Sequence, residues 1–206
     1  MPDLVLASQS LGRKKLLQYL KIPFEIFPST LKEEKINAST PEKTLQLRAK
    51  LKGEDVAKKL FARAALANGS ATSYLILSAD SGAIFDGKLI GKPHGRKEAV
   101  RILKTLAGHR HKYITSTYII KLMLSQVEAS KSIIYQGENS SFVTFRKMTE
   151  AEINFFLDRT DYRRFAAAYI LVSSQDFITR VEGSLSNVIG LPLEDVIPVL
   201  KKENLL

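Results

Sequence analysis

A group of small and basic residues near the start of the chain could bind an anion. Ser8, Ser10 and Gly12 separate a short apolar run from a leucine-rich segment that begins with Arg13. If the run is a strand and the segment a helix, these residues lie where backbone N–H groups have no partner inside the helix. Such groups, together with a guanidinium that can bind two phosphate oxygens, favour a phosphate site. The alternative is that Ser10 only caps the helix and Arg13 points into water.

An acidic residue in the middle of the chain is a second candidate. Asp80 follows the apolar residues 74–77, so we expect it at the carboxyl end of a buried strand, where open α/β sheets bind ligands. A carboxylate there could hold a divalent metal or accept a proton from water. Alternatively, Asp80 caps a turn with Ser81 and Gly82. Lys92, in the sequence "LIGKP", could present its ammonium from a constrained loop or simply be solvated.

Bulk properties exclude several classes of protein. The 206 residues are 45% hydrophobic and 25% charged, as in an ordinary globular domain, and they include no apolar run long enough for a membrane span. The absence of cysteine excludes disulfides and thiol catalysis. The N-terminus carries no export pattern, so we expect a cytoplasmic protein. A net charge of +10 suggests a polyanionic partner, but the basic residues alternate with acids, and solvated lysines are the simpler interpretation.

The elements that must position these residues follow from apolar periodicity and from glycine and proline. Asp86-Gly87 predicts a hairpin turn, Thr149 with Glu152 predicts a capping box, and residues 125–140 are interpreted as a polar linker. Strands are predicted at residues 4–7, 22–27, 74–77, 112–123, 141–146 and 177–181, and helices at 13–20, between 40 and 69, at 96–106, at 150–158 and from 193. Because some strands are adjacent in sequence, we expect a mixed sheet with flanking helices.

Five short motifs follow one another in the sequence and span essentially the whole chain: "LVLASQSLGRKKLL", "SADSGAIFDGKLIGKP", "LAGH", "MTEAEI" and "RVEGSLSNVIGLPL". Taken together in this order, they resemble the Maf family of nucleoside triphosphate pyrophosphatases. The resemblance implies an α/β fold with an elongated mixed β-sheet, flanking helices and a central cleft, as in inosine triphosphate pyrophosphatases. It implies one domain over residues 1–206, with two lobes around the cleft as a variant, and a homodimer.

The resemblance also implies a reaction. Family members use a divalent cation, expected here to be Mg²⁺ or Mn²⁺, to cleave a nucleoside triphosphate between the α and β phosphates. The products are the monophosphate and pyrophosphate. Carried over by motif, the catalytic residues are Asp80, Lys52 and Lys92, the metal ligands are Glu33 and Asp80, and the phosphate- and substrate-binding residues are Ser8, Gly12, Arg13 and Ser81.

Three departures from the family pattern concern the recognition of the base. The family's "SPRR" turn is "SLGR" here, so Gly12 stands in place of the first arginine. Ser81 replaces the threonine of members that act on thymidine and uridine triphosphates. The family's "DKAGAYGIQG" is replaced by "RRFAAAYILV" at residues 163–172, which contains no glutamine. We therefore expect a dTTP- or UTP-like or a modified nucleotide as substrate, with altered base selectivity.

Two other functions remain open at this point. The first is a regulatory protein that binds nucleotides, has weakened catalytic activity and retains the fold. Gly12 and the altered segment at residues 163–172 favour this function, whereas the retained Asp80, Lys52 and Lys92 argue against it. Nucleic-acid binding through the basic surface ranks last. Aromatic residues make up only 8% of the chain, and no nucleic-acid-binding module is recognisable.

Overall fold

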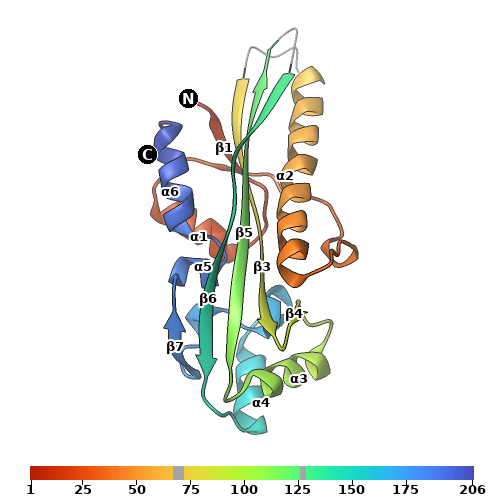
Figure 1. Ribbon diagram of the computed structural model, residues 1–206, viewed down its shortest axis with the longest axis vertical. Coiled ribbons are helices and arrows are strands. Elements are labelled where there is room, and N and C mark those ends of the chain that lie inside the picture. The colour runs from red at the N-terminus through yellow and green to blue at the C-terminus, as the bar shows by residue number, and fades with distance from the viewer. Residues whose placement is uncertain (67–71, 126–128) are drawn as a thin grey trace. The chain divides into compact units, whose positions relative to one another are not determined.

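The computed structural model describes residues 1–66, 72–125 and 129–206 (Figure 1). These residues fall into two compact units. Unit 1 contains Met1–Asp80, Ser116–Glu138 and Gly190–Leu206, and unit 2 contains Ser81–Thr115 and Asn139–Ile189. Each unit therefore combines segments that are far apart in the sequence.

Strands and helices alternate along most of the chain. The strands are β1 (Asp3–Leu6), β2 (Glu25–Ile26), β3 (Thr72–Phe85), β4 (Lys88–Ile90), β5 (Arg110–Leu124), β6 (Ala129–Phe145) and β7 (Ile178–Glu182). The α-helices are α1 (Leu11–Tyr19), α2 (Pro41–Leu66), α3 (Arg96–Leu106), α4 (Glu150–Arg159), α5 (Leu185–Ile189) and α6 (Leu193–Lys202). Short 3₁₀ helices are η1 (Glu33–Lys35), η2 (Tyr162–Arg164), η3 (Ala166–Ala168) and η4 (Leu171–Ser173).

Within the described residues, all seven strands belong to one mixed sheet. Its order is β2-β1-β3-β5-β6-β7, with β4 paired to β3. Strand β1 is parallel to β2 and β3, whereas β4 is antiparallel to β3 and β7 is antiparallel to β6. The predicted mixed sheet with flanking helices is confirmed.

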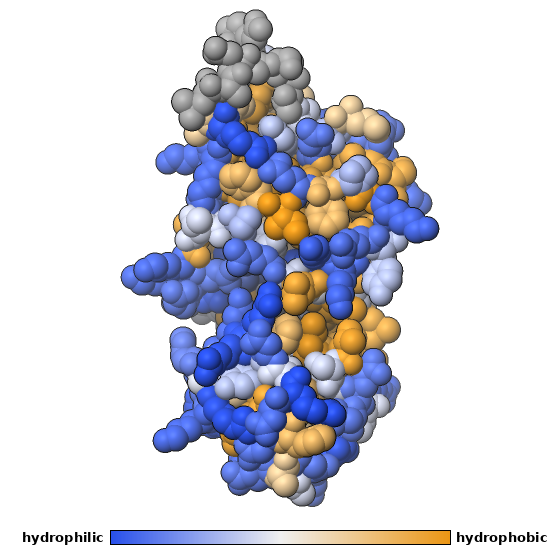
Figure 2. Space-filling view, turned by 180° about the vertical axis from the view of Figure 1, so that it is seen from behind, coloured by the Kyte–Doolittle hydropathy of each residue, from blue (hydrophilic) through white to orange (hydrophobic). Residues whose placement is uncertain are grey.

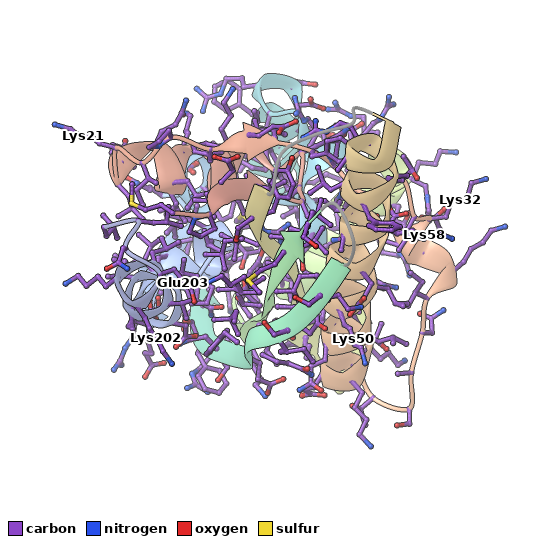
Figure 3. All side chains as sticks on the ribbon, turned by 90° about the horizontal axis from the view of Figure 1, so that it is seen from above. Lys21, Lys32, Lys50, Lys58, Lys202 and Glu203 are labelled. Carbon is purple, nitrogen blue, oxygen red and sulfur yellow. The ribbon has the colours of Figure 1, made fainter. Side chains whose placement is uncertain are left out.

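In unit 1, helices cover both sides of the strands. Helix α2 lies on one side, and α1 and α6 lie on the other (Figures 1 and 3). The apolar side of α2 packs on the strands through residues such as Ala49, Val56 and Leu60. Lys50 and Lys58 point outward from the same helix (Figure 3). These exposed lysines fit the interpretation of the positive charge as solvated surface.

In unit 2, the core is rich in aromatic rings. Phe145 makes edge-on contacts with His111, Tyr169 and Phe177, with ring centroids 4.8–4.9 Å apart. Edge-to-face contacts at this spacing are the favoured arrangement of aromatic pairs. Helices α3 and α4 pack against each other beside this core.

Several local predictions are confirmed. Asp86 and Gly87 join β3 to β4, and their φ angles of 47° and 69° are those that a two-residue hairpin turn requires. Thr149 and Glu152 form a capping box at the start of α4. The hairpin turn and the capping box depend only on neighbouring residues, which explains why the sequence was sufficient to predict them.

Other predictions are wrong, and the sheet explains why. Asp80 lies inside the continuous strand β3, not at a strand end. Most of the expected polar linker at residues 125–140 belongs to β6, since a strand can carry polar side chains on a solvated face of its sheet. Helix α1 begins at Leu11, so Gly12 lies within it. The predicted end of the long helix near Gly69 falls outside the described residues.

One face of the molecule is mixed in polarity. On the face drawn in Figure 2, apolar side chains reach the surface in separate patches among hydrophilic ones. Among the described residues, no helix combines the length and the apolar character that crossing a membrane would require.

Candidate functional site

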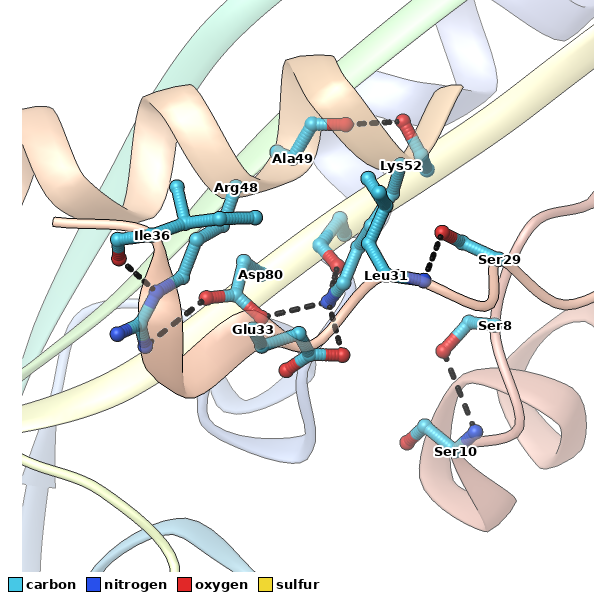
Figure 4. Close-up of polar contacts among 12 residues, drawn as sticks. Ser8, Ser10, Ser29, Leu31, Glu33, Ile36, Arg48, Ala49, Lys52 and Asp80 are labelled. Carbon is cyan, nitrogen blue, oxygen red and sulfur yellow. Dashed lines mark hydrogen bonds and ion pairs between the residues drawn. The ribbon is translucent and has the colours of Figure 1, made fainter. Parts of the chain in front are cut away.

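Helix α2 supplies two cations to a cluster in unit 1. Thr40 precedes the helix and its side chain accepts a hydrogen bond from the Lys43 N–H at 3.2 Å, as an N-cap does. Arg48 and Lys52 are four residues apart and therefore lie on the same side of the helix, one turn from each other. Both side chains point towards Asp80 on β3 (Figure 4).

Lys52 is the centre of this cluster. Its Nζ lies 2.7 Å from Asp80 Oδ1 and 2.9 Å from Glu33 Oε1, and it donates to the Ala79 carbonyl at 3.2 Å. The Lys52 side chain is only 6% exposed. A buried ammonium needs counter-charges and hydrogen-bond acceptors, and these three oxygens provide them. The structure thus brings Asp80, which the sequence itself suggested, together with Lys52 and Glu33, which were implied by resemblance alone.

The two oxygens of Asp80 have different surroundings. Oδ1 accepts the short bond from Lys52, whereas Oδ2 lies 3.9 Å from Arg48 Nη1. That distance is too long for a hydrogen bond but close enough for an electrostatic attraction. No sequence motif quoted above pointed to Arg48. Its i, i+4 spacing from Lys52 was the signal that could have identified it.

Side-chain hydrogen bonds hold the turn before α1 and the first turn of that helix in place. The Ser10 side chain accepts from the Arg13 N–H at 3.4 Å, so Ser10 does cap the helix. Arg13 does not point into water: it is 7% exposed, its Nη1 donates to Ser8 Oγ at 2.8 Å and its Nε donates to the Gly190 carbonyl at 2.7 Å. Gly190 belongs to the "RVEGSLSNVIGLPL" motif. Gly12 is buried in α1.

Two of the predicted site residues belong to unit 2. The Ser81 hydroxyl lies 2.9 Å from the Thr115 hydroxyl, which also donates to the Asn187 carbonyl at 2.9 Å. Ser81 is therefore held by the polar interior of unit 2. Lys92 is exposed in the loop after β4.

Two carboxylates in unit 1 could contribute to a metal site. Within the part of the chain that the structure describes, no group of three or more His, Asp or Glu side chains could hold a metal ion by itself. Asp80 and Glu33 approach the same ammonium and so lie close together. One or two carboxylates, with substrate phosphates completing the shell, are the usual protein ligands of Mg²⁺. The donor set therefore fits a cation shared with a phosphorylated ligand.

Comparisons with known proteins support the family resemblance that the motifs indicated. The sequence profile of a family described as "Maf-like protein" matches residues 3–203. A "dTTP/UTP pyrophosphatase" of Ruminiclostridium cellulolyticum is 32% identical over 206 residues, covering 99% of this chain and 97% of the relative. Another of the same name, from Alkaliphilus oremlandii, is 34% identical over 94% of this chain and 92% of its own. The solved Staphylococcus aureus Ham1 protein aligns over 98% and 97% of the two chains, with 13% identity and a TM-score of 0.40. The family profile and the relatives each cover nearly the whole chain, which belongs to the Maf family.

Proposed function

We propose that the protein hydrolyses a nucleoside triphosphate to the monophosphate and pyrophosphate. The observation that carries this proposal is the contact of Lys52 with both Asp80 and Glu33 in a chain of the Maf family. It places a buried carboxylate, a second carboxylate and a cation within a few ångströms of one another. These are the groups that hydrolysis of a phosphoanhydride needs.

In the proposed reaction, a water molecule attacks the α-phosphorus. Asp80 accepts a proton from this water through Oδ2, since Oδ1 is engaged by Lys52. The bond between the α-phosphorus and the oxygen that bridges to the β-phosphorus breaks, and pyrophosphate leaves. Lys52 and Arg13 neutralise charge on the phosphates, and electrostatic stabilisation of this kind is a major part of phosphoryl-transfer catalysis.

A divalent cation, Mg²⁺ or Mn²⁺, is part of the proposal. Asp80 and Glu33 would hold it together with phosphate oxygens, and when bound it would neutralise negative charge on the triphosphate. The hard oxygen ligands favour these ions over softer metals. Glu33 is 36% exposed and lies in the short η1 helix, so it can reach a ligand from solvent.

The proposed substrate is a pyrimidine nucleotide of the dTTP or UTP type. The relatives described above carry that name, and Ser81 retains a hydroxyl next to Asp80. Gly12 and residues 163–172 depart from the family pattern, so we expect weaker discrimination among bases than a strict dTTP or UTP enzyme would show. Comparing kcat/KM for dTTP, UTP, dCTP and dGTP measures this selectivity.

Release of pyrophosphate tests the activity itself. Wild-type protein is incubated with a panel of standard and modified triphosphates in Mg²⁺ or Mn²⁺, and Asp80→Asn serves as the inactive control. We expect kcat of the variant to fall by about 10³-fold or more, because the acceptor of the proton is lost. Saturable nucleotide binding without release of pyrophosphate would contradict the proposal and favour a regulatory nucleotide-binding protein.

A further inference from the structure

Four polar residues form a row on one side of α2. Arg48, Lys52, Asp55 and Lys59 are spaced by four, three and four residues, which places them on one face of a helix. All four contact the segment of residues 29–37, which we call the Glu33 strap. Helix α2 therefore holds this segment along more than two helical turns.

Arg48 holds the C-terminal end of the strap. Its Nε donates to the Ile36 carbonyl at 2.8 Å, and its Nη2 donates to Asn37 Oδ1 at 3.3 Å. The remaining Nη1 faces Asp80 Oδ2 at 3.9 Å. The side chain is 14% exposed, so most of the guanidinium is enclosed by these partners. One planar group thus contacts both the strap and the carboxylate on β3.

Asp55 and Lys59 hold the other end. Asp55 Oδ2 accepts hydrogen bonds from the Ser29 hydroxyl at 2.9 Å and from the Thr30 N–H at 3.1 Å. Lys59 Nζ lies 2.6 Å from Asp55 Oδ2 and 2.6 Å from Thr30 Oγ1. The two ends of the strap are therefore attached independently, one through Asp55 with Lys59 and the other through Arg48.

Glu33 lies between the two attachments. Its contact in the cluster is the 2.9 Å ion pair with Lys52, and its side chain is 36% exposed. Contacts of a partly exposed carboxylate are weakened by solvent screening and opposed by side-chain entropy. The attachments at the two ends of the strap therefore add to what fixes the Glu33 carboxylate relative to Asp80.

We propose that Arg48 is a positioning residue for the reaction: it fixes the Glu33 strap against α2 and orients Asp80 so that Oδ2 faces the substrate. The second half rests on the proposed function; the first does not. The guanidinium presents donors in several fixed directions, whereas a lysine ammonium is a compact charge on a flexible chain. Charge alone therefore cannot replace Arg48, and Arg48→Lys is expected to resemble Arg48→Gln.

Steady-state kinetics test the catalytic half. For Arg48→Gln and Arg48→Lys we expect kcat to fall about 10–100-fold, the usual cost of removing a residue that orients a catalytic or metal-binding group. KM for the nucleotide should change by less than about threefold, because ground-state binding of the phosphates is retained. The matched control is Arg63→Gln, on the same helix, which loses contacts of 2.8 and 3.1 Å with Glu25 outside the site and should keep wild-type kinetics.

Hydrogen exchange tests the structural half without any substrate. The Thr30 amide donates to Asp55, and the Lys35 and Ile36 amides donate to carbonyls within the strap. Arg48→Gln should accelerate exchange at Lys35 and Ile36 by about tenfold or more while leaving Thr30 close to wild type. Asp55→Ala should show the opposite pattern, because it releases the other end.

Distinct results would overturn the proposal. Unchanged exchange at residues 35 and 36 in Arg48→Gln would show that Arg48 does not hold the strap. Full kcat in Arg48→Lys would show that only charge is needed, and a raised KM with unchanged kcat would make Arg48 a phosphate ligand instead. If exchange behaves as expected but wild-type protein releases no pyrophosphate, the proposed function fails while the structural role of Arg48 is supported.

Discussion

Unit 1 and unit 2 bury polar side chains of different kinds. Among the described residues, the buried side chains that carry charge at neutral pH are Arg13, Lys52 and Asp80, and all three belong to unit 1. The buried polar side chains of unit 2 are neutral, as in His111 and Asn187. Among the described residues, buried charge is therefore confined to unit 1, whereas unit 2 buries neutral polar side chains.

This difference sets the proposed site in unit 1 apart from the core of unit 2. Buried charges cost several kcal/mol of desolvation each and contribute little net stability, so we connect those of unit 1 with the proposed reaction. Neutral hydrogen bonds cost less to bury and serve to order a core. Asn187 illustrates this role: its amide donates to the Tyr113 carbonyl at 3.1 Å and to Ser141 Oγ at 2.9 Å. Substitutions in the two units should therefore have distinguishable effects.

The largest effect is expected for Lys52→Met in unit 1. This change leaves the buried Asp80 carboxylate without its short ion pair, and breaking such a pair typically costs about 3–5 kcal/mol of stability. It also removes a cation expected to neutralise the triphosphate, so kcat/KM should fall by about 10³-fold. Chemical denaturation and pyrophosphate release measure the two losses.

The double variant Lys52→Met/Asp80→Asn sharpens this test. Because it removes both charges, it should recover much of the stability lost in Lys52→Met while remaining inactive. A double variant no more stable than Lys52→Met would mean that the stability loss comes from the lost packing of the Lys52 side chain and not from the unpaired charge of Asp80. The contrast between the units would then lose its electrostatic basis.

The next effect concerns acid stability of unit 2. Burial lowers the pKa of His111 from its ordinary 6.5 to about 4. Between these values the unfolded chain binds more protons than the folded one, so the His111 contribution is fully present above pH 6.5 and is lost as pH falls towards 4. The loss amounts to about 3 kcal/mol at most.

Unfolding free energies measured from pH 7 to pH 4 check this expectation. The slope of the unfolding free energy against pH should be smaller in His111→Gln than in the wild type. The glutamine amide can still reach the Tyr169 hydroxyl, which lies 2.8 Å from His111 Nε2. The exposed His94 provides a matched control, His94→Gln. An identical slope in wild type and His111→Gln would contradict the assignment of this acid sensitivity to unit 2.

A smaller effect is expected for Gly53→Ala, which tests how α2 positions Lys52. An added Cβ would lie 2.8 Å from Ser78 Oγ and 2.9 Å from a Tyr118 ring carbon, so either α2 or these two buried side chains must shift. We expect a loss of about 1–3 kcal/mol, together with a reduced kcat because Lys52 is adjacent. Gly91→Ala, where nothing lies within 4 Å, should change neither quantity. A loss of stability with full kcat would show that the cluster tolerates movement of the helix.

The smallest effect is expected for Thr149→Ala in unit 2. It removes the capping box of α4, in which the Glu152 N–H donates to Thr149 Oγ1 at 3.2 Å. Losing an N-cap costs about 1 kcal/mol. Thermal or chemical unfolding should register this loss, whereas kcat and KM should remain those of the wild type. A changed kcat would indicate that unit 2 stability influences the reaction, against the division proposed above.

Local signals predicted much of the fold. The hairpin at Asp86-Gly87, the capping box at Thr149 and the mixed sheet followed from backbone preferences and apolar periodicity, which act over a few residues. The same signals misplaced Asp80, because the small and polar residues that follow it look like a turn although β3 continues through them. Whether a strand continues depends on its partners in the sheet, and these are distant in sequence.

The sequence by itself determined the family, through motifs in a fixed order, and it identified Asp80 and Arg13 as chemically suited to a site. Only the tertiary structure decided that Lys52 contacts both Asp80 and Glu33 with Arg48 beside Asp80, and that Arg13 is anchored to the Gly190 carbonyl. The reason is physical. A charged side chain reveals its role only through the partners that remove it from water, and here those partners come from elements far apart along the chain.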